Sequence, residues 1–368
     1  MSLAIYRKYR PATFEDLLGQ EMVIRILREA AKQGKLAHSY LFAGPRGTGK
    51  TTTSRIIAKI ANCEKRAGDA KFKAKGEPCN QCQSCTAIDE GHSIDVIEID
   101  AASNRGIDEI RSLRESVRVS PVSSVNKVFI IDEAHQLTKD AANALLKTLE
   151  EPPEHVIFIL ATTEADKILT TILSRTQQFY FKHAPIEHIV KKLKNIAGEE
   201  KIKISPDALE LIASSAEGSF RDAESLLDQL VTFGDKDITV EEVEGMVGKV
   251  GFKKLSGFAE LLLQSNVKDA LASLAEIQDG GYNLPQFTKD LIQYLRRVMV
   301  LKYNPDMKEM FKTEVMAEHL VKLEVHAKLF KDAHVNLVKS LITAYSQMRY
   351  SQFPIIPLEV AIVEGTKN

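Results

Sequence analysis

Residues 39–52 have the sequence SYLFAGPRGTGKTT, a short apolar run followed by a glycine-rich loop that ends in lysine and threonine. The segment from Gly44 to Thr51 fits the pattern G-x4-G-K-S/T throughout. The apolar run predicts a strand before the loop, and residues 51–62 predict a helix after it, the setting in which such loops bind phosphate. The glycines let backbone N–H groups turn toward phosphate oxygens, and the helix start adds a partial positive charge. These residues therefore predict a nucleotide-binding α/β domain.

Side-chain chemistry predicts roles within this loop. Lys50 is placed to reach the β- and γ-phosphates, and the hydroxyl of Thr51 is placed to join the coordination shell of Mg²⁺. The expected nucleotide contacts are Gly44, Pro45, Arg46, Gly47, Thr48, Gly49, Lys50, Thr51 and Thr52.

A second motif, VFIIDEAH at residues 128–135, places two carboxylates at the end of an apolar run. Parallel α/β folds bind ligands at the carboxyl ends of their strands. Asp132 is suited to hold Mg²⁺, and Glu133 to polarise the attacking water as general base. The alternative is an ordinary strand end with capping acids, but with the loop upstream the pair favours hydrolysis over passive nucleotide binding. We expect His135 to support these acids or to end the strand rather than to act as a ligand.

All four cysteines of the chain, Cys63, Cys79, Cys82 and Cys85, fall within 23 residues. Disulfides are a poor explanation in a cytosolic chain, whereas Zn²⁺ takes four thiolates in a tetrahedron and closely spaced cysteines supply them at low cost in loop closure. Such a site is structural, because it leaves no open position for catalytic water. The alternative is four free thiols on a surface loop. Because the cysteines and the phosphate loop lie on different elements, we expect loss of one ligand to destabilise the insertion and spare the loop.

The first 180 residues alternate apolar runs with helical patterns, which is typical of a parallel α/β sheet. The expected strands are 39–43, 96–100, 128–132, 156–162 and 178–181, and the expected helices are 51–62, 107–119 and 140–150. The polar residues 65–76 predict an exposed insertion ahead of the metal site.

After residue 183 the strand patterns stop, and short helices are expected over 186–197, 206–216, 222–233 and 239–247. Thr239 is predicted to cap the last of these, with Glu242 completing a capping box. From residue 252 the pattern is helical to the end, which is typical of core packing and also suits oligomerisation.

Length and composition exclude several classes of protein. With 368 residues, two or three domains are expected; we place them at 1–182, 183–248 and 249–368, with a zinc module at about 63–85. Forty-nine Lys and Arg residues against fifty Asp and Glu residues leave a net charge of −1, so any DNA contact must come from a local patch. The apolar runs are too short to span a bilayer, and no secretion signal is evident. We expect a cytoplasmic protein with no membrane partner.

Further motifs occur downstream: LATT at 160–163, SRT at 174–176 and GSFRD at 218–222. With the two nucleotide motifs, they resemble AAA+ ATPases of the clamp-loader clade. Residues 6–11 (YRKYRP) with Phe14 and 19–21 (GQE), the four-cysteine insertion, and residues 143–153 (NALLKTLEEPP) are similar to the gamma/tau family of bacterial DNA polymerase III clamp-loader subunits. The resemblance is dense over residues 1–250 and looser over 251–368, where it rests on helical character and on PLE at 357–359.

This resemblance implies roles at individual positions. It makes Thr163 a sensor of the γ-phosphate and Arg221 the lid arginine that reaches back to the same phosphate. It makes Arg175 an arginine finger presented to ATP bound in the neighbouring subunit, and it places Arg10 and Pro11 near the adenine. Guanidinium groups at the γ-phosphate would stabilise charge that develops in the transition state. The family's usual Ser-Arg-Cys is Ser-Arg-Thr here, a departure with no evident chemical consequence.

The fold class implied is α/β: a P-loop AAA+ domain with a parallel sheet and a zinc-binding insertion, followed by a helical lid domain and an all-helical collar domain. The function implied is that of an ATP-driven motor subunit that opens a sliding clamp and loads it onto primed DNA during replication. Its cofactors would be ATP, Mg²⁺ and Zn²⁺. Its partners would be other clamp-loader subunits in a hetero-oligomeric ring, further copies of itself, the sliding clamp and primed DNA.

Two alternative functions stay open. One is another AAA+ DNA remodeller, such as a branch-migration motor; the four cysteines and the helical tail argue against it. The other is a clamp-loader scaffold that does not hydrolyse ATP, which has no need for the complete set Lys50, Thr51, Asp132 and Glu133.

A DNA-binding surface is predicted on the helix expected at 107–119. Arg111, Arg114 and Arg118 share one face of it, and a row of guanidinium groups can follow phosphates without reading bases. The resemblance implies that this region lies on the inner wall of the spiral formed by the clamp-loader subunits. The acidic neighbours on this helix are Asp108, Glu109 and Glu115. The alternative is a solvated face in which these acids pair with the arginines.

Overall fold

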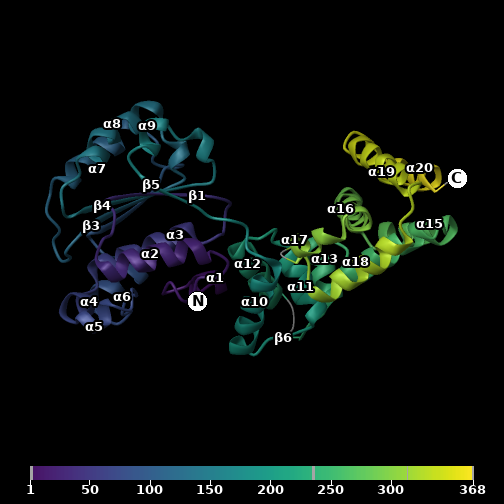
Figure 1. Cartoon of the computed structure of the whole chain (residues 1–368), viewed down its shortest axis with the longest axis horizontal. Coiled ribbons are helices and arrows are strands. Elements are labelled where there is room, and N and C mark those ends of the chain that lie inside the picture. Colours follow the sequence, from purple (N-terminus) through teal and green to yellow (C-terminus); the bar gives the residue numbers. More distant parts are fainter. Residues whose placement is uncertain (1–2, 234–236, 313, 367–368) are drawn as a thin grey trace. The chain divides into compact units, whose positions relative to one another are not determined.

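The computed structural model describes residues 3–233, 237–312 and 314–366. The chain forms two compact units (Figure 1). The first comprises Met1–Ala184 with Ser219–Arg221, and the second comprises Pro185–Gly218 with Asp222–Asn368. Ser219–Arg221 therefore belong to the first unit, although the residues on both sides of them in sequence belong to the second.

The first unit is built on a parallel sheet of five strands in the order β2-β3-β4-β1-β5. The strands are β1 Ser39–Ala43, β2 Val96–Asp100, β3 Lys127–Asp132, β4 Val156–Thr162 and β5 Gln177–Tyr180. The five predicted strands are confirmed, with shifts of one residue in β3 and β5. Ala43 pairs in register with Thr162 and with Tyr180, so the carboxyl ends of β4, β1 and β5 lie level.

Helices cover both faces of this sheet (Figure 1). On one face lie α2 (Glu21–Gln33) and α3 (Lys50–Asn62); on the other lie α7 (Ile107–Val117), α8 (Lys139–Glu150) and the one-turn α9 (Thr170–Leu173). Alternate residues of β1 enter the two hydrophobic layers: Tyr40 and Phe42 pack with α2 and α3, and Leu41 packs with residues of α7 and α8. Both faces of β1 and β4 are therefore buried, as the apolar runs predict for parallel strands.

Three short helices form the insertion after α3: α4 (Glu64–Gly68), α5 (Ala70–Lys73) and α6 (Gln83–Glu90). The prediction that residues 65–76 are simply exposed is wrong at Arg66, which is buried. Its guanidinium donates hydrogen bonds to the carbonyl oxygens of Ala31, Lys73 and Glu77, at 2.8, 3.2 and 3.3 Å. This side chain therefore fastens the insertion to the end of α2. Single turns at α1 (Ile5–Lys8), η1 (Ala134–Gln136) and η2 (Ala165–Lys167) complete the first unit.

The second unit begins with α10 (Ile186–Glu200), α11 (Pro206–Ser215), all but the first two residues of α12 (Phe220–Phe233), and α13 (Val240–Val247). The capping box of Thr239 and Glu242 is confirmed. The expectation of no further strands is wrong, because β6 (Lys203–Ile204) and β7 (Asp237–Ile238) form a parallel pair. Two-residue strands are too short to show a period of two in the sequence.

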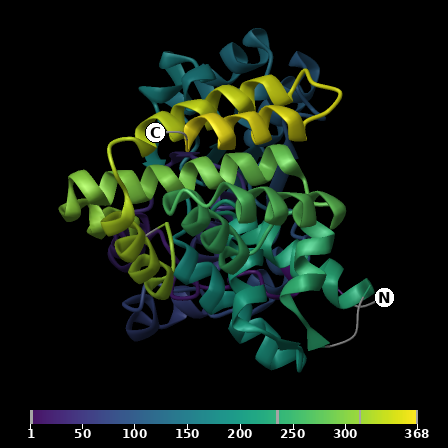
Figure 2. The same cartoon turned by 90° about the vertical axis from the view of Figure 1, so that its right-hand side faces the viewer.

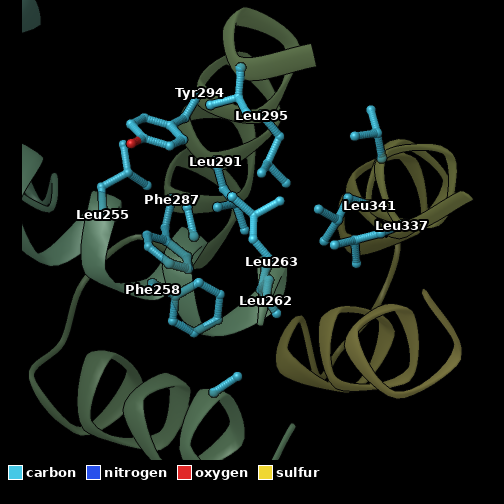
Figure 3. Packing of buried hydrophobic residues seen from close by; sticks show 14 of the residues in the cluster. Leu255, Phe258, Leu262, Leu263, Phe287, Leu291, Tyr294, Leu295, Leu337 and Leu341 are labelled. Atoms are coloured by element: carbon cyan, nitrogen blue, oxygen red, sulfur yellow. The ribbon is translucent and has the colours of Figure 1, made fainter. Parts of the chain in front are cut away.

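The remaining elements of the second unit are helical. They are α14 (Phe252–Leu263), α15 (Val267–Asp279), α16 (Leu284–Tyr303), η3 (Pro305–Met307), α17 (Lys308–Phe311), α18 (Ala317–Leu329), α19 (His334–Met348) and α20 (Ile355–Gly365). Phe258 of α14 and Phe287 of α16 meet edge to face at 5.1 Å in the core (Figure 3). The helices α19 and α20 lie side by side, with α16 next to α19 (Figure 2).

Among the described residues, no helix combines the length and the apolar character that crossing a membrane requires.

Candidate nucleotide site and cysteine cluster

The phosphate loop connects β1 to α3 at the carboxyl edge of the sheet. Three of its glycines, Gly44, Gly47 and Gly49, have φ angles of 146°, 71° and 101°. A Cβ atom on Gly44 would lie 2.3 Å from the Phe181 carbonyl oxygen, and one on Gly47 would lie 1.8 Å from Ser219 Oγ. Both the backbone conformation and the lack of space therefore require glycine at these two positions.

Lys50 opens α3 and turns its side chain back over the loop. Its Nζ donates hydrogen bonds of 2.8 Å to the carbonyl oxygens of Gly44 and Pro45. Burial lowers the pKa of Lys50, and the carboxylates of Glu133 and Asp132 oppose that shift. An ammonium group is therefore held inside the loop, where the phosphates of a nucleotide would need a cation.

Thr51 and Asp132 meet beside the loop. Thr51 Oγ1 donates a hydrogen bond to Asp132 Oδ2 at 2.8 Å, which joins the first turn of α3 to the end of β3. Two neighbouring ligands of octahedral Mg²⁺ at about 2.05 Å lie about 2.9 Å apart. The hydroxyl and the carboxylate are the hard oxygen donors that Mg²⁺ prefers, and they already have this separation. These two residues therefore fit a Mg²⁺ ion.

Glu133 follows in an unusual backbone conformation, with φ 48° and ψ 44°. This left-handed conformation is uncommon outside glycine and often marks a functional position. Its Oε2 accepts a hydrogen bond from Thr163 Oγ1 at 3.0 Å. The hydroxyl of Thr163, the residue after β4, therefore holds the carboxylate of Glu133, which the sequence predicts as the general base.

His135 lies behind Glu133, with its side chain only 4% exposed. Its Nδ1 lies 3.0 Å from Thr162 Oγ1 and 3.4 Å from Glu133 Oε2, and its Nε2 lies 3.2 Å from Glu164 Oε1. The sequence did not identify Glu164 as part of this network. Thr162 and Glu164 flank Thr163, and a polar run that starts at the last residue of the buried strand β4 is the pattern that points to them.

The GSFRD motif reaches the same loop. Phe220 N donates a hydrogen bond of 3.1 Å to the Gly47 carbonyl oxygen. Arg221 lies in the first turn of α12, which begins at Phe220, two residues before the predicted start. The guanidinium carbon of Arg221 lies 5.2 Å from the ring centroid of Tyr6, so Arg221 and this N-terminal residue lie close together.

Arg10 lies in a cluster of basic side chains near Arg221. Burial lowers the pKa of Arg10, nearby Arg55 lowers it further, and Glu98 opposes the shift. Arg55 of α3 forms two hydrogen bonds to the carboxylate of Glu98 on β2, at 2.5 and 2.6 Å. The sequence did not identify Arg55 or Glu98. The polar Glu98 between the apolar Ile97 and Ile99 is the pattern that points to this pair.

Arg175 lies two residues after the end of α9, and its side chain contacts α8 and α9. Its guanidinium pairs with Glu150 of α8 at 3.1 Å and donates to the Thr171 carbonyl oxygen at 2.9 Å. In the part of the chain that the structure describes, Arg175 has no hydrogen bond or ion pair to the phosphate loop.

The four cysteines come together. Their sulfur atoms all lie within 4.8 Å of one another, and no disulfide joins them. The distance between Cys79 Sγ and Cys85 Sγ is 3.9 Å, and a tetrahedron with Zn–S bonds of about 2.3 Å needs about 3.8 Å. Burial raises the pKa of the Cys79 thiol, but N–H donors from Gln81 and Cys82 outweigh it and bring the pKa to about 7. Both the donor set and the spacing fit Zn²⁺.

Arg111, Arg114 and Arg118 are exposed, as predicted for one face of α7 and its C-terminal cap. Arg111 pairs with Asp108 at 3.2 Å. One arginine of the three thus has an acidic partner on the same helix, as the solvated-face alternative expects.

The sequence matches three family models in succession. They are described as "DNA polymerase III, delta subunit" over residues 19–185, "DNA polymerase III clamp loader subunit, ATPase lid domain" over residues 188–236, and "DNA polymerase III subunits gamma and tau domain III" over residues 238–365.

Curated relatives agree with these matches. DNA polymerase III subunit tau of Bacillus subtilis is 42% identical over 98% of this chain and 62% of its own length. The subunit of the same name in Escherichia coli is 40% identical over 81% of this chain and 45% of its own length. The chain therefore spans less than two thirds of the length of these relatives.

Solved structures give weaker likenesses. A Bacillus subtilis DNA clamp loader delta protein covers 94% of this chain and 99% of its own at 14% identity, with a TM-score of 0.42. The Thermotoga maritima RuvB Holliday junction branch migration motor covers 73% of this chain and 85% of its own at 18% identity, with a TM-score of 0.46.

Proposed function

The chain belongs to the gamma/tau family of DNA polymerase III clamp-loader subunits, and on this premise we propose that it is an ATP-hydrolysing motor subunit of a clamp loader. Its architecture is that of the family: an AAA+ domain, a lid and a collar. We propose that the domains divide at 182/183 and 248/249. The observation that supports hydrolysis most directly is the paired arrangement of Thr51 with Asp132 and of Thr163 with Glu133.

In the proposed mechanism, the backbone of residues 44–49 and the ammonium group of Lys50 bind the phosphates of ATP. Thr51 and Asp132 would hold Mg²⁺, and a bound Mg²⁺ ion would neutralise charge on the β- and γ-phosphates. Glu133 accepts a proton from the attacking water at a carboxylate oxygen, and Thr163 fixes the direction of that carboxylate. Arg221 adds positive charge at the γ-phosphate from the start of the lid helix.

We propose that Arg175 acts on ATP bound in a neighbouring subunit. Its pairing with Glu150 supports this role, because the ion pair keeps the guanidinium on the surface of α8 and α9, away from its own phosphate loop. The side chain is partly exposed, and surface ion pairs of this kind are weak, so exchange of Glu150 for a phosphate would cost little.

The proposed cofactors are ATP, Mg²⁺ and one Zn²⁺ held by Cys63, Cys79, Cys82 and Cys85. The proposed partners are other clamp-loader subunits and further copies of this chain, joined through residues 249–368, together with the sliding clamp and primed DNA. We place the action of the protein in the cytoplasm, where the DNA is replicated. Arg111, Arg114 and Arg118 are the proposed contacts to DNA phosphates, since this contact needs no base recognition.

An assay of ATP hydrolysis by the reconstituted assembly tests this function. We expect hydrolysis to rise when the sliding clamp and primed DNA are both added. A rate that responds to branched DNA but not to the clamp would instead support a branch-migration motor. Tight ATP binding with no hydrolysis under any condition would support a scaffold.

A further inference from the structure

The N-terminal residues 10–17 lie between the phosphate loop and the cysteine module. At one end, a Cβ atom on Gly49 would lie 3.5 Å from Leu17 Cδ2, so this segment borders the loop. At the other end are Arg10 and Pro11, which the resemblance to the clamp-loader family implies lie near the adenine, and which we propose as contacts of the base. Residues 10–17 contain no helix or strand. Asp16 accepts hydrogen bonds from Ala12 N and Thr13 N within the segment, and side chains from outside it hold two further backbone groups, the Ala12 carbonyl and the Phe14 amide.

Lys59 provides the first of these attachments. It lies on α3, nine positions after Lys50, and its side chain is only 1% exposed. Its Nζ donates hydrogen bonds to the Ala12 carbonyl oxygen at 2.9 Å and to Asn80 Oδ1 at 2.8 Å, and it pairs with Asp89 at 2.8 Å. Asn80 lies between Cys79 and Cys82 with φ 54°. One buried ammonium group therefore joins the phosphate-loop helix, the cysteine loop and the N-terminal segment.

Glu77 provides the second attachment. Its Oε2 accepts a hydrogen bond from Phe14 N at 2.8 Å, and its Oε1 pairs with Arg28 of α2 at 3.2 Å. Both Phe14 and Glu77 are buried, and Glu77 precedes Cys79 by two residues. A buried backbone N–H needs a partner, so the position of Phe14 depends on the position of the loop that carries Glu77.

From these contacts we infer that the cysteine module, residues 63–85, holds residues 10–17 in the position in which they bind the base of the nucleotide. Lys59 and Glu77 are the positioning residues. The inference rests on the nucleotide site proposed above. It agrees with the expectation that loss of a metal ligand spares the phosphate loop, and it adds an effect on binding of the base. Neither side chain needs to touch the nucleotide, because each fixes a backbone group of the segment that would do so.

The inference predicts a specific division of binding energy. The phosphates are held by residues 44–51, whereas the base is held by the N-terminal segment. Loss of Lys59 should therefore weaken binding of ATP and leave binding of inorganic tripolyphosphate unchanged. General damage to the domain would weaken the binding of ATP and of tripolyphosphate alike.

The test is calorimetric titration of the full chain with Mg·ATP and with Mg·tripolyphosphate. We expect Lys59→Met to weaken ATP binding about tenfold, the scale of one lost interaction with a charged group, with tripolyphosphate affinity unchanged. Lys71→Met is the matched control, because Lys71 is an exposed lysine of the same insertion; it should change neither affinity. Removal of Zn²⁺ by a chelator before the titration should reproduce the Lys59→Met result. It should also raise the rate of hydrogen exchange at the amide of Phe14.

Equal losses for both ligands, or no loss for ATP, would overturn the inference. If Lys59→Met does not fold, Glu77→Leu tests the same prediction, since it removes the acceptor of the Phe14 amide and keeps much of the side-chain volume. The parent chain separates this inference from the proposed function: failure of the unmodified protein to bind ATP overturns both, whereas normal ATP binding by a folded variant overturns only the positioning role.

Discussion

Thr163 Oγ1 donates a hydrogen bond to Glu133 Oε2 at 3.0 Å, so the proposed γ-phosphate sensor directly holds the proposed general base. Glu133 is further constrained by its left-handed backbone and by His135, which lies 3.4 Å from the same carboxylate oxygen. A carboxylate held in this way can be released or turned when Thr163 finds another acceptor. A γ-phosphate oxygen would be such an acceptor, and under the proposed roles ATP binding would then change the position of the Glu133 carboxylate.

Substitution Glu133→Gln tests the role of this carboxylate. The amide keeps the shape of the side chain but cannot take up a proton, so we expect hydrolysis to fall by about 10²–10⁴. ATP binding should be retained, and the DNA-bound state should accumulate because hydrolysis no longer releases it. Single-turnover hydrolysis measures the first of these three effects, and nucleotide titration measures the second. Normal turnover by this variant would remove Glu133 from the mechanism.

Substitution Lys50→Ala should act one step earlier, on ATP binding rather than on hydrolysis of bound ATP. It removes the ammonium group held by Gly44 and Pro45, which is the cation available inside the loop for the β- and γ-phosphates. We therefore expect ATP binding itself to be abolished, as measured by calorimetry. Thermal unfolding of the variant is the control, because a fold that melts as the parent does ties the loss to the site. Binding that survives with parental affinity would contradict the assignment of the loop.

The metal content of the purified chain tests the cysteine cluster. We expect about one Zn²⁺ per chain under reducing conditions, measured by elemental analysis. Cys82→Ser should lower the metal content and destabilise the insertion. Recovery of iron in place of zinc, or of no metal, would show that the four thiols serve another purpose.

The sequence predicts the buried strands and the phosphate loop better than it predicts contacts between distant segments of the chain. Strands such as β1 and β4 are predicted because each is a short apolar run in the sequence, which is typical of a parallel strand buried on both faces. The phosphate loop is predicted because its glycine and lysine positions are fixed by the chemistry of phosphate binding. In both cases the information is local, within about ten neighbouring residues.

Contacts between distant parts of the chain were not predictable in this way. Nothing in the sequence near Lys59 indicates that its side chain is buried against Ala12 and Asn80. An isolated lysine on a helix is ordinarily solvated, so local sequence favours the wrong environment. Arg66 is misleading for the same reason, since it lies in a polar stretch and is nevertheless buried.

The proposed action of Arg175 on ATP in a neighbouring subunit distinguishes a ring motor from a self-contained ATPase. One experiment, in which two variants are mixed, tests this action directly. Arg175→Ala should lower hydrolysis in the assembly, by up to about 10³–10⁵ as for arginine fingers in other P-loop enzymes, while nucleotide affinity stays nearly intact. When Arg175→Ala chains are mixed with Lys50→Ala chains, some interfaces combine an intact phosphate loop with an intact Arg175. Partial recovery of hydrolysis in the mixture is the predicted result, because the arginine then acts on its neighbour. No recovery, with co-assembly of the two chains demonstrated, would contradict the account and show that Arg175 serves its own subunit.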